Sequence, residues 1–255
     1  MNIVVAIKHV PSTADELELN EDGTNLDFDE IDFLLNEFDE HAIEQAVLLK
    51  EAAGGEVTVV GVDIIEELDG VLHTALAKGA DKAAKIVGDI EPPVSSHVQA
   101  KWLADAIREM NPDLVLTGVQ AVDDLDGQIG PMLAAYLDLP YVGVVTGVSS
   151  KNGSVVAHKE FAGGVMAEYE VALPAVLGIQ AAEKPPRYAP ISKIRQMAKS
   201  AEIEEFEADE DFEYEGCELR KMAKPESAGH AEMIEGDPEE VAEKIIAILE
   251  ERGLL

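Results

Sequence analysis

The amino-acid sequence predicts an α/β fold, a parallel sheet to which antiparallel strands and a C-terminal arm are added. Up to Tyr141, short apolar runs alternate with amphipathic helical segments. This alternation is typical of βαβ units, whose strands form a parallel sheet with right-handed crossovers. After Tyr141 the segments become short and β-branched, and turn signals separate them. The chain has 255 residues, 47% of them hydrophobic, which is enough to bury a sizeable core.

The first part of the chain is expected to hold the parallel strands and the helices between them. The expected strands are 2–7, 57–62, 83–87 and 114–116, apolar runs of the kind that strands buried on both faces use. The expected helices are one that Asn36 caps and Gly54 ends, followed by 64–77, 97–110 and 131–137. A proline-containing loop at 8–13 and an irregular excursion or hairpin at 15–32 precede the first helix.

The second part is expected to add antiparallel hairpins and then an arm. The hairpin strands are 142–148, 155–158, 166–171 and 175–179, and Asn152-Gly153 is their strongest turn signal. The segment PPRYAP at 185–190 fits neither a helix nor a central strand, and a short basic helix follows at 191–199. Residues 201–229 are acidic and irregular, and 238–251 form an amphipathic helix. We therefore expect an α/β domain at 1–199 and, at 200–255, an extended acidic arm and helix that pack on a partner subunit.

The charge and the cysteine content exclude several classes of protein. Asp and Glu number 52 against 19 Lys and Arg, a net charge of -33. Such a charge repels nucleic acid and anionic membrane surfaces, so neither is an expected partner. The single cysteine, Cys217, excludes an internal disulfide and a cysteine-cluster metal site. The sequence starts without a signal peptide and has no apolar run near the roughly 20 residues of a membrane span, so we expect a cytoplasmic protein that is not membrane-inserted.

The segment DLVLTGVQAVDDLDGQIGPM at 113–132 is the candidate ligand site. It predicts a buried strand, a polar loop and a helix N-terminus, the place where doubly wound sheets bind ligands. Its glycines let the backbone approach a phosphate, and Gln120 and Asp123 suit an adenine or a ribose. We expect the phosphate contacts to come from the backbone N–H groups of 127–130 and from Gln128. The alternative is an ordinary strand–helix connection.

Motifs for catalysis are absent from the sequence. It contains no G-x-x-x-x-G-K-S/T phosphate loop, no G-x-S-x-G elbow and no H-E-x-x-H zinc site. The six histidines show no metal-ligand spacing, and Asp123-Asp124 is a weak magnesium candidate in so acidic a chain. This favours a cofactor holder over an enzyme whose side chains perform the chemistry.

Five blocks of sequence, taken together and in order, point to a family. They are VAIKHV at 5–10, NEFDEHAIEQAVLLKE at 36–51, TALAKGADKA at 74–83, GVQAVDDLDGQIGPM at 118–132 and PPRYAPISKI at 185–194. The chain resembles the β subunit of electron transfer flavoprotein. The resemblance implies a flavodoxin-like or adenine-nucleotide-hydrolase-like sheet, bound AMP, and an FAD shared with an α subunit. It also implies electron transfer from acyl-CoA and related dehydrogenases, in fatty acid oxidation, to a quinone oxidoreductase.

The resemblance carries site residues over by position. The AMP contacts fall at strand ends, at a helix start and in the loop: Ala6, Asn36, Glu37, Phe38, Asp39, Val62, Gly118, Gln120, Ala121, Asp123, Asp126, Gly127, Gln128 and Ile129. The partner-recognition loop falls on Pro186, Arg187, Tyr188 and Ile191, with Ile191 as the apolar anchor. The alternative for Ile191 is packing in the core, and Asn36 has a second possible role as a helix cap.

Three alternatives remain open. AMP-binding members tend to read D-D-D-x-N-Q-T-G-Q where this chain has DDLDGQIGP at 123–131. The end of this loop is similar to electron-bifurcating members, which hold a second FAD in place of AMP. Outside this family, an adenine-nucleotide hydrolase or ligase, or a universal-stress-type module, is a further candidate. The loop 8–13 lacks the glycines that a hydrolase of this type needs after its first strand.

The acidic residues, spread through the whole chain, predict a halophilic, archaeal-type member of this family. At about 1 M salt the Debye length is about 3 Å, so repulsion between surface carboxylates is nearly abolished. We expect the melting temperature to rise steeply between low and molar KCl, measured by circular dichroism. A melting temperature that stays flat over this range contradicts the prediction.

Overall fold

The computed structural model describes residues 1–14, 16–29, 31–209, 211–212, 214, 216, 219–225 and 231–255. It divides into two compact units, Met1–Met222 and Ala223–Leu255. The first unit holds the sheet and its helices, and the second holds one helix. None of the described helices is both long and apolar enough to cross a bilayer.

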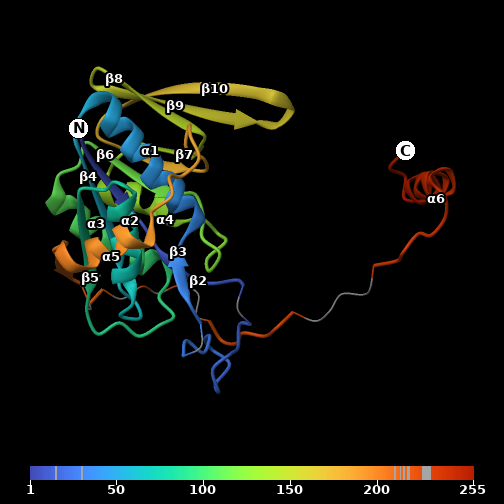
Figure 1. The fold of residues 1–255 in the computed structure, drawn as a ribbon, viewed down its shortest axis with the longest axis horizontal. Coiled ribbons are helices and arrows are strands. Elements are labelled where there is room, and N and C mark those ends of the chain that lie inside the picture. The colour runs from blue at the N-terminus through green and yellow to red at the C-terminus, as the bar shows by residue number, and fades with distance from the viewer. Residues whose placement is uncertain are drawn as a thin grey trace. The chain divides into compact units, whose positions relative to one another are not determined.

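A seven-stranded parallel sheet forms the centre of the first unit (Figure 1). Its strands, in spatial order, are β12 (Ile203–Glu207), β5 (Lys82–Val87), β4 (Glu56–Val62), β1 (Asn2–Ala6), β6 (Leu114–Gly118), β11 (Ala175–Ile179) and β7 (Tyr141–Val145). Every neighbouring pair is parallel. The central strands are buried on both faces, which explains their continuous apolar sequences.

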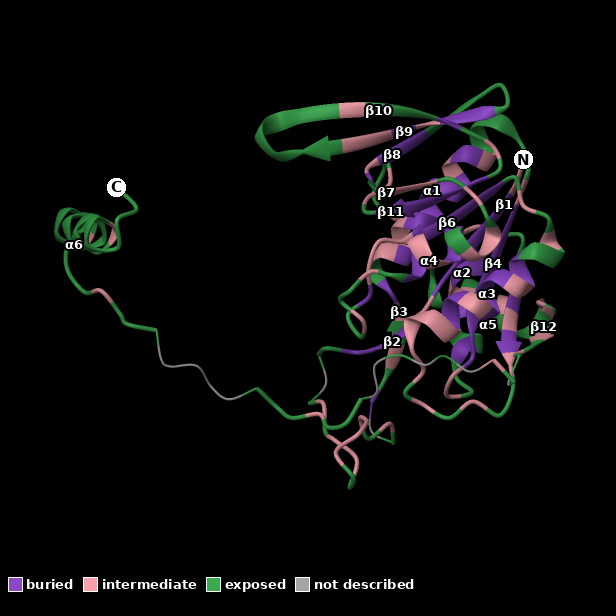
Figure 2. Cartoon of the chain, turned by 180° about the vertical axis from the view of Figure 1, so that it is seen from behind, coloured by how far each residue is buried: buried purple, intermediate pink, exposed green. Residues whose placement is uncertain are grey.

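Two helical layers cover the two faces of the sheet. Helices α1 (Glu37–Ala53) and α2 (Leu68–Lys78) pack on one face, and α3 (Ser96–Met110) and α4 (Ile129–Leu137) on the other. Because successive strand residues point to opposite faces, Leu114 and Leu116 belong to the first core and Val115 to the second. Figure 2 shows the central strands as the most buried part of the chain. The expected pattern of βαβ units is confirmed.

The order of the strands reverses at β1. After β1 the chain forms β4 and β5 on one side, and then crosses to form β6 on the other. At such a switch point the carboxyl ends of adjacent strands leave a crevice. The N-terminus of α1 begins at this edge, since Asn36 N donates to the Lys8 carbonyl just after β1.

The antiparallel part of the prediction is half right. Strands β8 (Gly147–Lys151), β9 (Ser154–Phe161) and β10 (Val165–Ala172) form a separate antiparallel sheet, and Asn152-Gly153 makes the first of its turns. A short 3₁₀ turn, η1 (Ala162–Gly164), joins β9 to β10. The segments 141–145 and 175–179, however, are parallel members of the main sheet. The expected strand 142–148 is broken at Thr146, a bend that separates β7 from β8.

The arm prediction is wrong for residues 203–207. This acidic segment is β12, an edge strand that pairs in parallel with β5. Ile203 packs against one core and Phe206 against the other, while the glutamates between them stay exposed or half-buried. Trp102 on α3 also holds the residues that follow β12, since its Nε1 donates to the Asp209 carbonyl at 2.9 Å. The compact unit therefore continues past the expected boundary at residue 199, to Met222.

The remaining elements are short or separate. Strands β2 (His9–Pro11) and β3 (Phe33–Leu35) pair antiparallel and enclose the expected excursion, in which Leu19 and Leu26 form a bridge. Helix α5 (Ile191–Ser200) packs against α2 and confirms the expected basic helix. In the second unit, α6 (Pro238–Glu251) begins after the N-cap Asp237, and none of its residues is buried.

Candidate functional site

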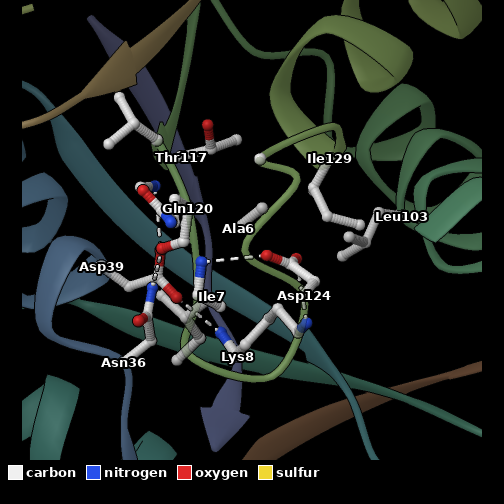
Figure 3. A pocket seen from close by; sticks show the side chains of 14 residues that line it. Ala6, Ile7, Lys8, Asn36, Asp39, Leu103, Thr117, Gln120, Asp124 and Ile129 are labelled. Atoms are coloured by element: carbon white, nitrogen blue, oxygen red, sulfur yellow. Dashed lines mark hydrogen bonds and ion pairs between the residues drawn. The ribbon is translucent and has the colours of Figure 1, made fainter. Parts of the chain in front are cut away.

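The candidate site is a crevice at the carboxyl edge of β1 and β6, beside the N-terminus of α1 (Figure 3). Its cavity volume is about 20 Å³, which is close to the space that one water molecule needs. The lining residues come from these strand ends, from α1, α3 and α4, and from the loop after β6. They are Ala6, Ile7, Lys8, Asn36, Asp39, Leu103, Thr117, Gly118, Val119, Gln120, Ala121, Asp124, Gly127 and Ile129.

The structure places a part of the expected nucleotide contacts on this lining. Those that line the crevice are Ala6, Asn36, Asp39, Gly118, Gln120, Ala121, Gly127 and Ile129. Those that do not are Glu37, Phe38, Val62, Asp123, Asp126 and Gln128. Val62 is buried in the core beneath α3, and Asp123 lines a neighbouring apolar cavity with His9. The Gln128 side chain turns back on its own loop, where its Nε2 donates to the Asp126 carbonyl at 2.9 Å.

Asp39 holds the two strand ends together. It lies in the first turn of α1 and is 4% exposed. Its Oδ2 accepts from the Lys8 backbone N–H at 2.8 Å, and its Oδ1 accepts from the Gly118 N–H at 2.8 Å. A Cβ on Gly118 would collide with this carboxylate, so residue 118 must be glycine while Asp39 makes both bonds. One side chain thus fixes the spacing of β1, β6 and α1.

Lys8 is a site residue that the sequence analysis missed. Its Nζ lies 2.8 Å from Asp123 Oδ2 and 3.2 Å from Asp124 Oδ2, so it forms ion pairs with both acids. Burial lowers the pKa of Lys8, but these two carboxylates together raise it above its usual value. The signal was available, because Lys8 follows the first strand directly and so lies at the ligand edge. No metal-binding group of three or more acidic, histidine or cysteine side chains occurs among the residues described.

Further hydrogen bonds close the loop 119–128 over the crevice. Asn36 occupies the N-cap position of α1, but its side chain makes no cap; its Nδ2 donates instead to the Gln120 carbonyl at 3.0 Å. Asp124 Oδ1 accepts from the Ala121 N–H at 3.0 Å. Gly127 has φ 62°, a conformation that favours glycine, and lets the loop turn toward α4.

The expected partner-recognition loop is fixed to α1 by Arg187. The guanidinium binds Glu44 through Nε at 2.8 Å and Nη2 at 2.9 Å, and Glu51 through Nη1 at 2.9 Å. Burial raises the pKa of Glu44, but Arg187 outweighs this and holds it below its usual value. Arg187 is therefore committed to contacts within the chain.

Two other side chains of α1 hold the start of the same loop. His41 Nδ1 accepts from the Ala182 N–H at 3.2 Å, and Gln45 Oε1 accepts from the Glu183 N–H at 3.1 Å. Sequence reasoning assigned no role to His41, Glu44 or Gln45, because their partners lie more than 130 residues away in the chain.

Tyr188 and Ile191 remain at the surface, 81% and 62% exposed, while Pro186 is half-buried. The alternative in which Ile191 packs in the core is therefore wrong. An exposed isoleucine at the first position of a helix leaves its side chain available to a partner.

Comparison with known proteins decides the family. Residues 26–211 match the model of the electron transfer flavoprotein domain. The chain belongs to the electron transfer flavoprotein family. It is 35% identical to the electron transfer flavoprotein subunit beta of Methylophilus methylotrophus, over 98% of both chains. The corresponding subunit of Bacillus subtilis (strain 168) is 31% identical over 98% of this chain and 97% of its own. A mitochondrial beta subunit from Oryza sativa subsp. indica is 34% identical over 80% of each chain.

The family assignment identifies the chain as a β subunit and as an electron carrier, not a catalytic enzyme. This family assignment takes the place of the three alternatives from outside the family, which were a hydrolase, a ligase and a universal-stress-type module. The crevice of this electron transfer flavoprotein accordingly offers binding groups, among them backbone N–H donors, amides and one lysine.

The pKa of Asp39 determines how this β subunit responds to pH. Burial raises the pKa to about 7, although hydrogen bonds from Lys8, Asn36 and Gly118 lower it. An aspartate in the unfolded chain has a pKa of about 3.9. Because the folded state binds the proton more tightly, ionisation of Asp39 reduces the free energy of unfolding as the pH rises from about 4 to about 7.

We predict that Asp39→Asn flattens the pH dependence of stability between pH 4 and 7. The two pKa values of Asp39 differ by about 3, which corresponds to roughly 4 kcal/mol in the wild-type protein. Urea unfolding at constant KCl measures the slope, and Asp105→Asn, at a half-buried position on α3 outside the crevice lining, is the control. Equal slopes for the wild type and Asp39→Asn would contradict the prediction.

Proposed function

We propose that this chain is the β subunit of a heterodimeric, cytoplasmic electron transfer flavoprotein that binds AMP in the crevice and helps to enclose FAD. The α subunit holds most of the FAD site. The heterodimer accepts electrons from acyl-CoA and related dehydrogenases in fatty acid oxidation and passes them to a quinone oxidoreductase. The observation that carries the nucleotide part is the convergence at one sheet edge of Ala6, Asn36, Asp39, Gly118, Gln120, Ala121, Gly127 and Ile129.

The chemistry of the crevice suits a nucleotide. The strand-end N–H groups of Lys8 and Gly118 are taken by Asp39, so the N–H groups that suit an anion are those in the first turn of α4, and the rim carries the Asn36 and Gln120 amides. The two carboxylates that would repel a phosphate are occupied: Asp39 accepts two N–H groups, and Asp124 is paired with Lys8. A cavity of about 20 Å³ is smaller than a nucleotide, so entry requires the loop 119–128 to move outward.

Each of the two units carries exposed apolar side chains that support a subunit interface. In the first unit, the β9–β10 hairpin exposes Phe161, Val165, Met166 and Tyr169. In the second unit, α6 exposes Ile245, Ile246 and Ile248, which a solvated single helix would not retain. Contiguous exposed apolar residues mark interaction sites, so we assign both surfaces to the α subunit. The domain beyond residue 222 is then an arm that packs on this partner.

The alternative is an electron-bifurcating complex in which a second FAD occupies the crevice. The sequence Gln128-Ile129-Gly130-Pro131 at the start of α4 favours it, because this segment is similar to that of electron-bifurcating members. Asp124 and Asp126 favour AMP, since electron-bifurcating members tend to have a Gly and a Thr at these two positions.

Cofactor analysis of the purified heterodimer separates the two. We expect one FAD and one AMP per heterodimer after denaturation, quantified by absorbance and chromatography. Two flavins and no AMP would establish the bifurcating form, and a heterodimer without a nucleotide other than one FAD would contradict both.

We predict that Ile191→Ala slows electron transfer from the dehydrogenase. An exposed apolar anchor at the centre of an interface contributes about 2 kcal/mol, so the second-order rate should fall about thirty-fold. Stopped-flow reduction of the heterodimer by an acyl-CoA dehydrogenase measures the rate, with FAD content as the check on assembly. Leu34→Ala, which removes an exposed side chain on β3, is the control, and an unchanged rate for Ile191→Ala would remove the anchor assignment.

A further inference from the structure

Thr117 carries a buried hydroxyl that has no partner. The residue is 2% exposed and lines the crevice from the end of β6. Within the part of the chain that the structure describes, its Oγ1 accepts and donates no hydrogen bond. A buried hydroxyl in this state destabilises a fold, and valine has nearly the same shape without that penalty.

The strand neighbours of Thr117 offer its hydroxyl no partner, and the Tyr141 hydroxyl, which lies near the same point of α4, is not bonded to it. In register, Thr117 lies beside Ala6 on β1 and Gly178 on β11, and neither has a side chain that can bond to it. Across the crevice lies the first turn of α4, where a Cβ built on Gly130 would be 2.9 Å from Thr117 Oγ1. The hydroxyl therefore faces the N-terminus of α4 at close range (Figure 3 shows Thr117 and Ile129 among the residues that line the crevice).

The start of α4 adds donors at the same place. Helix geometry leaves the N–H groups of Ile129 and Gly130 without intrahelical acceptors, and the helix dipole favours a negative charge there. The first turn holds no acidic residue, in a chain with 52 of them. Asp126 lies just before the helix, and its Oδ1 accepts from the Gln128 N–H at 3.4 Å. Gln128 immediately precedes Ile129 and Gly130, so this carboxylate bonds to the residue before them.

We propose that Thr117 is an affinity-determining residue whose hydroxyl donates a hydrogen bond to the phosphate of the nucleotide, at the N-terminus of α4. This rests on the proposed nucleotide binding and names the side chain that anchors its anionic group. The hydroxyl, the two N–H groups and the dipole then act on one phosphate, while the nucleoside lies toward Asn36 and Gln120. The phosphate is the shared chemistry of AMP and of a second FAD.

The test compares Thr117→Val with Thr117→Ser in the complete heterodimer, freed of nucleotide. Titration calorimetry with AMP and with adenosine, which lacks the phosphate, reports the affinities. We expect Thr117→Val to weaken AMP binding by about ten-fold or more, as for a hydrogen bond to a charged group, and to leave adenosine binding unchanged. Thr117→Ser should restore most of the affinity, because it keeps the hydroxyl.

Two controls separate binding from folding. Thr58→Val, on β4 and away from the crevice lining, should change neither affinity. The melting temperature of nucleotide-free Thr117→Val should equal or exceed that of the wild type, since the unpartnered hydroxyl is gone. A lower melting temperature would show that Thr117 is a structural residue and would overturn the proposal.

The remaining outcomes identify which inference fails. If wild type binds neither AMP nor adenosine and carries no second flavin, the proposed nucleotide function fails, and the role of Thr117 with it. If the wild type binds AMP and Thr117→Val binds it equally well, only the role of Thr117 fails. Equal weakening of AMP and adenosine would overturn the phosphate assignment. If the crevice holds a second FAD, Thr117→Val should lower the flavin count per heterodimer.

Discussion

The carboxylate of Asp39 is the constraint on which the nucleotide edge depends. Parallel strands end with backbone N–H groups that have no further partner in the ladder, and here the N–H groups of Lys8 and Gly118 both point at one buried carboxylate. The same carboxylate lies in the positive first turn of α1, where the helix dipole favours it. Removing it would leave two buried donors unpaired at the point where α1, β1 and β6 meet.

The crevice also shows how a strongly acidic chain can keep an anion-binding site. With a net charge of -33, the average surface repels a phosphate. At this edge, however, Asp39 is satisfied by backbone donors, and Asp123 and Asp124 are paired with Lys8. Local pairing therefore reduces the repulsion that a phosphate meets at this edge, and it does so through short contacts that salt screens only weakly.

Much of the fold was predictable because local patterns determine it. The apolar runs of β1, β4, β5 and β6 and the glycine after α1 were sufficient to predict their elements. The strand β12 was not, because a segment with three glutamates in five residues is recognised as a strand only through its pairing with β5. The parallel direction of β7 and β11 is likewise a tertiary property, since their sequences resemble those of the antiparallel β9 and β10. In the site, residues on β1, β6 and α1 were predictable from strand ends, whereas the roles of Glu44 and Gln45 depend on a loop far away in the chain.

Helix α5 is tethered at both of its ends. Before it, Arg187 binds Glu44 and Glu51 on α1; after it, the chain enters β12 and joins the main sheet. A surface side chain presented by such a doubly anchored helix has little conformational freedom to lose when it is covered. Ile191, the proposed anchor, therefore lies on a segment that is already fixed at both ends. A partner protein that binds it does not have to order this segment first.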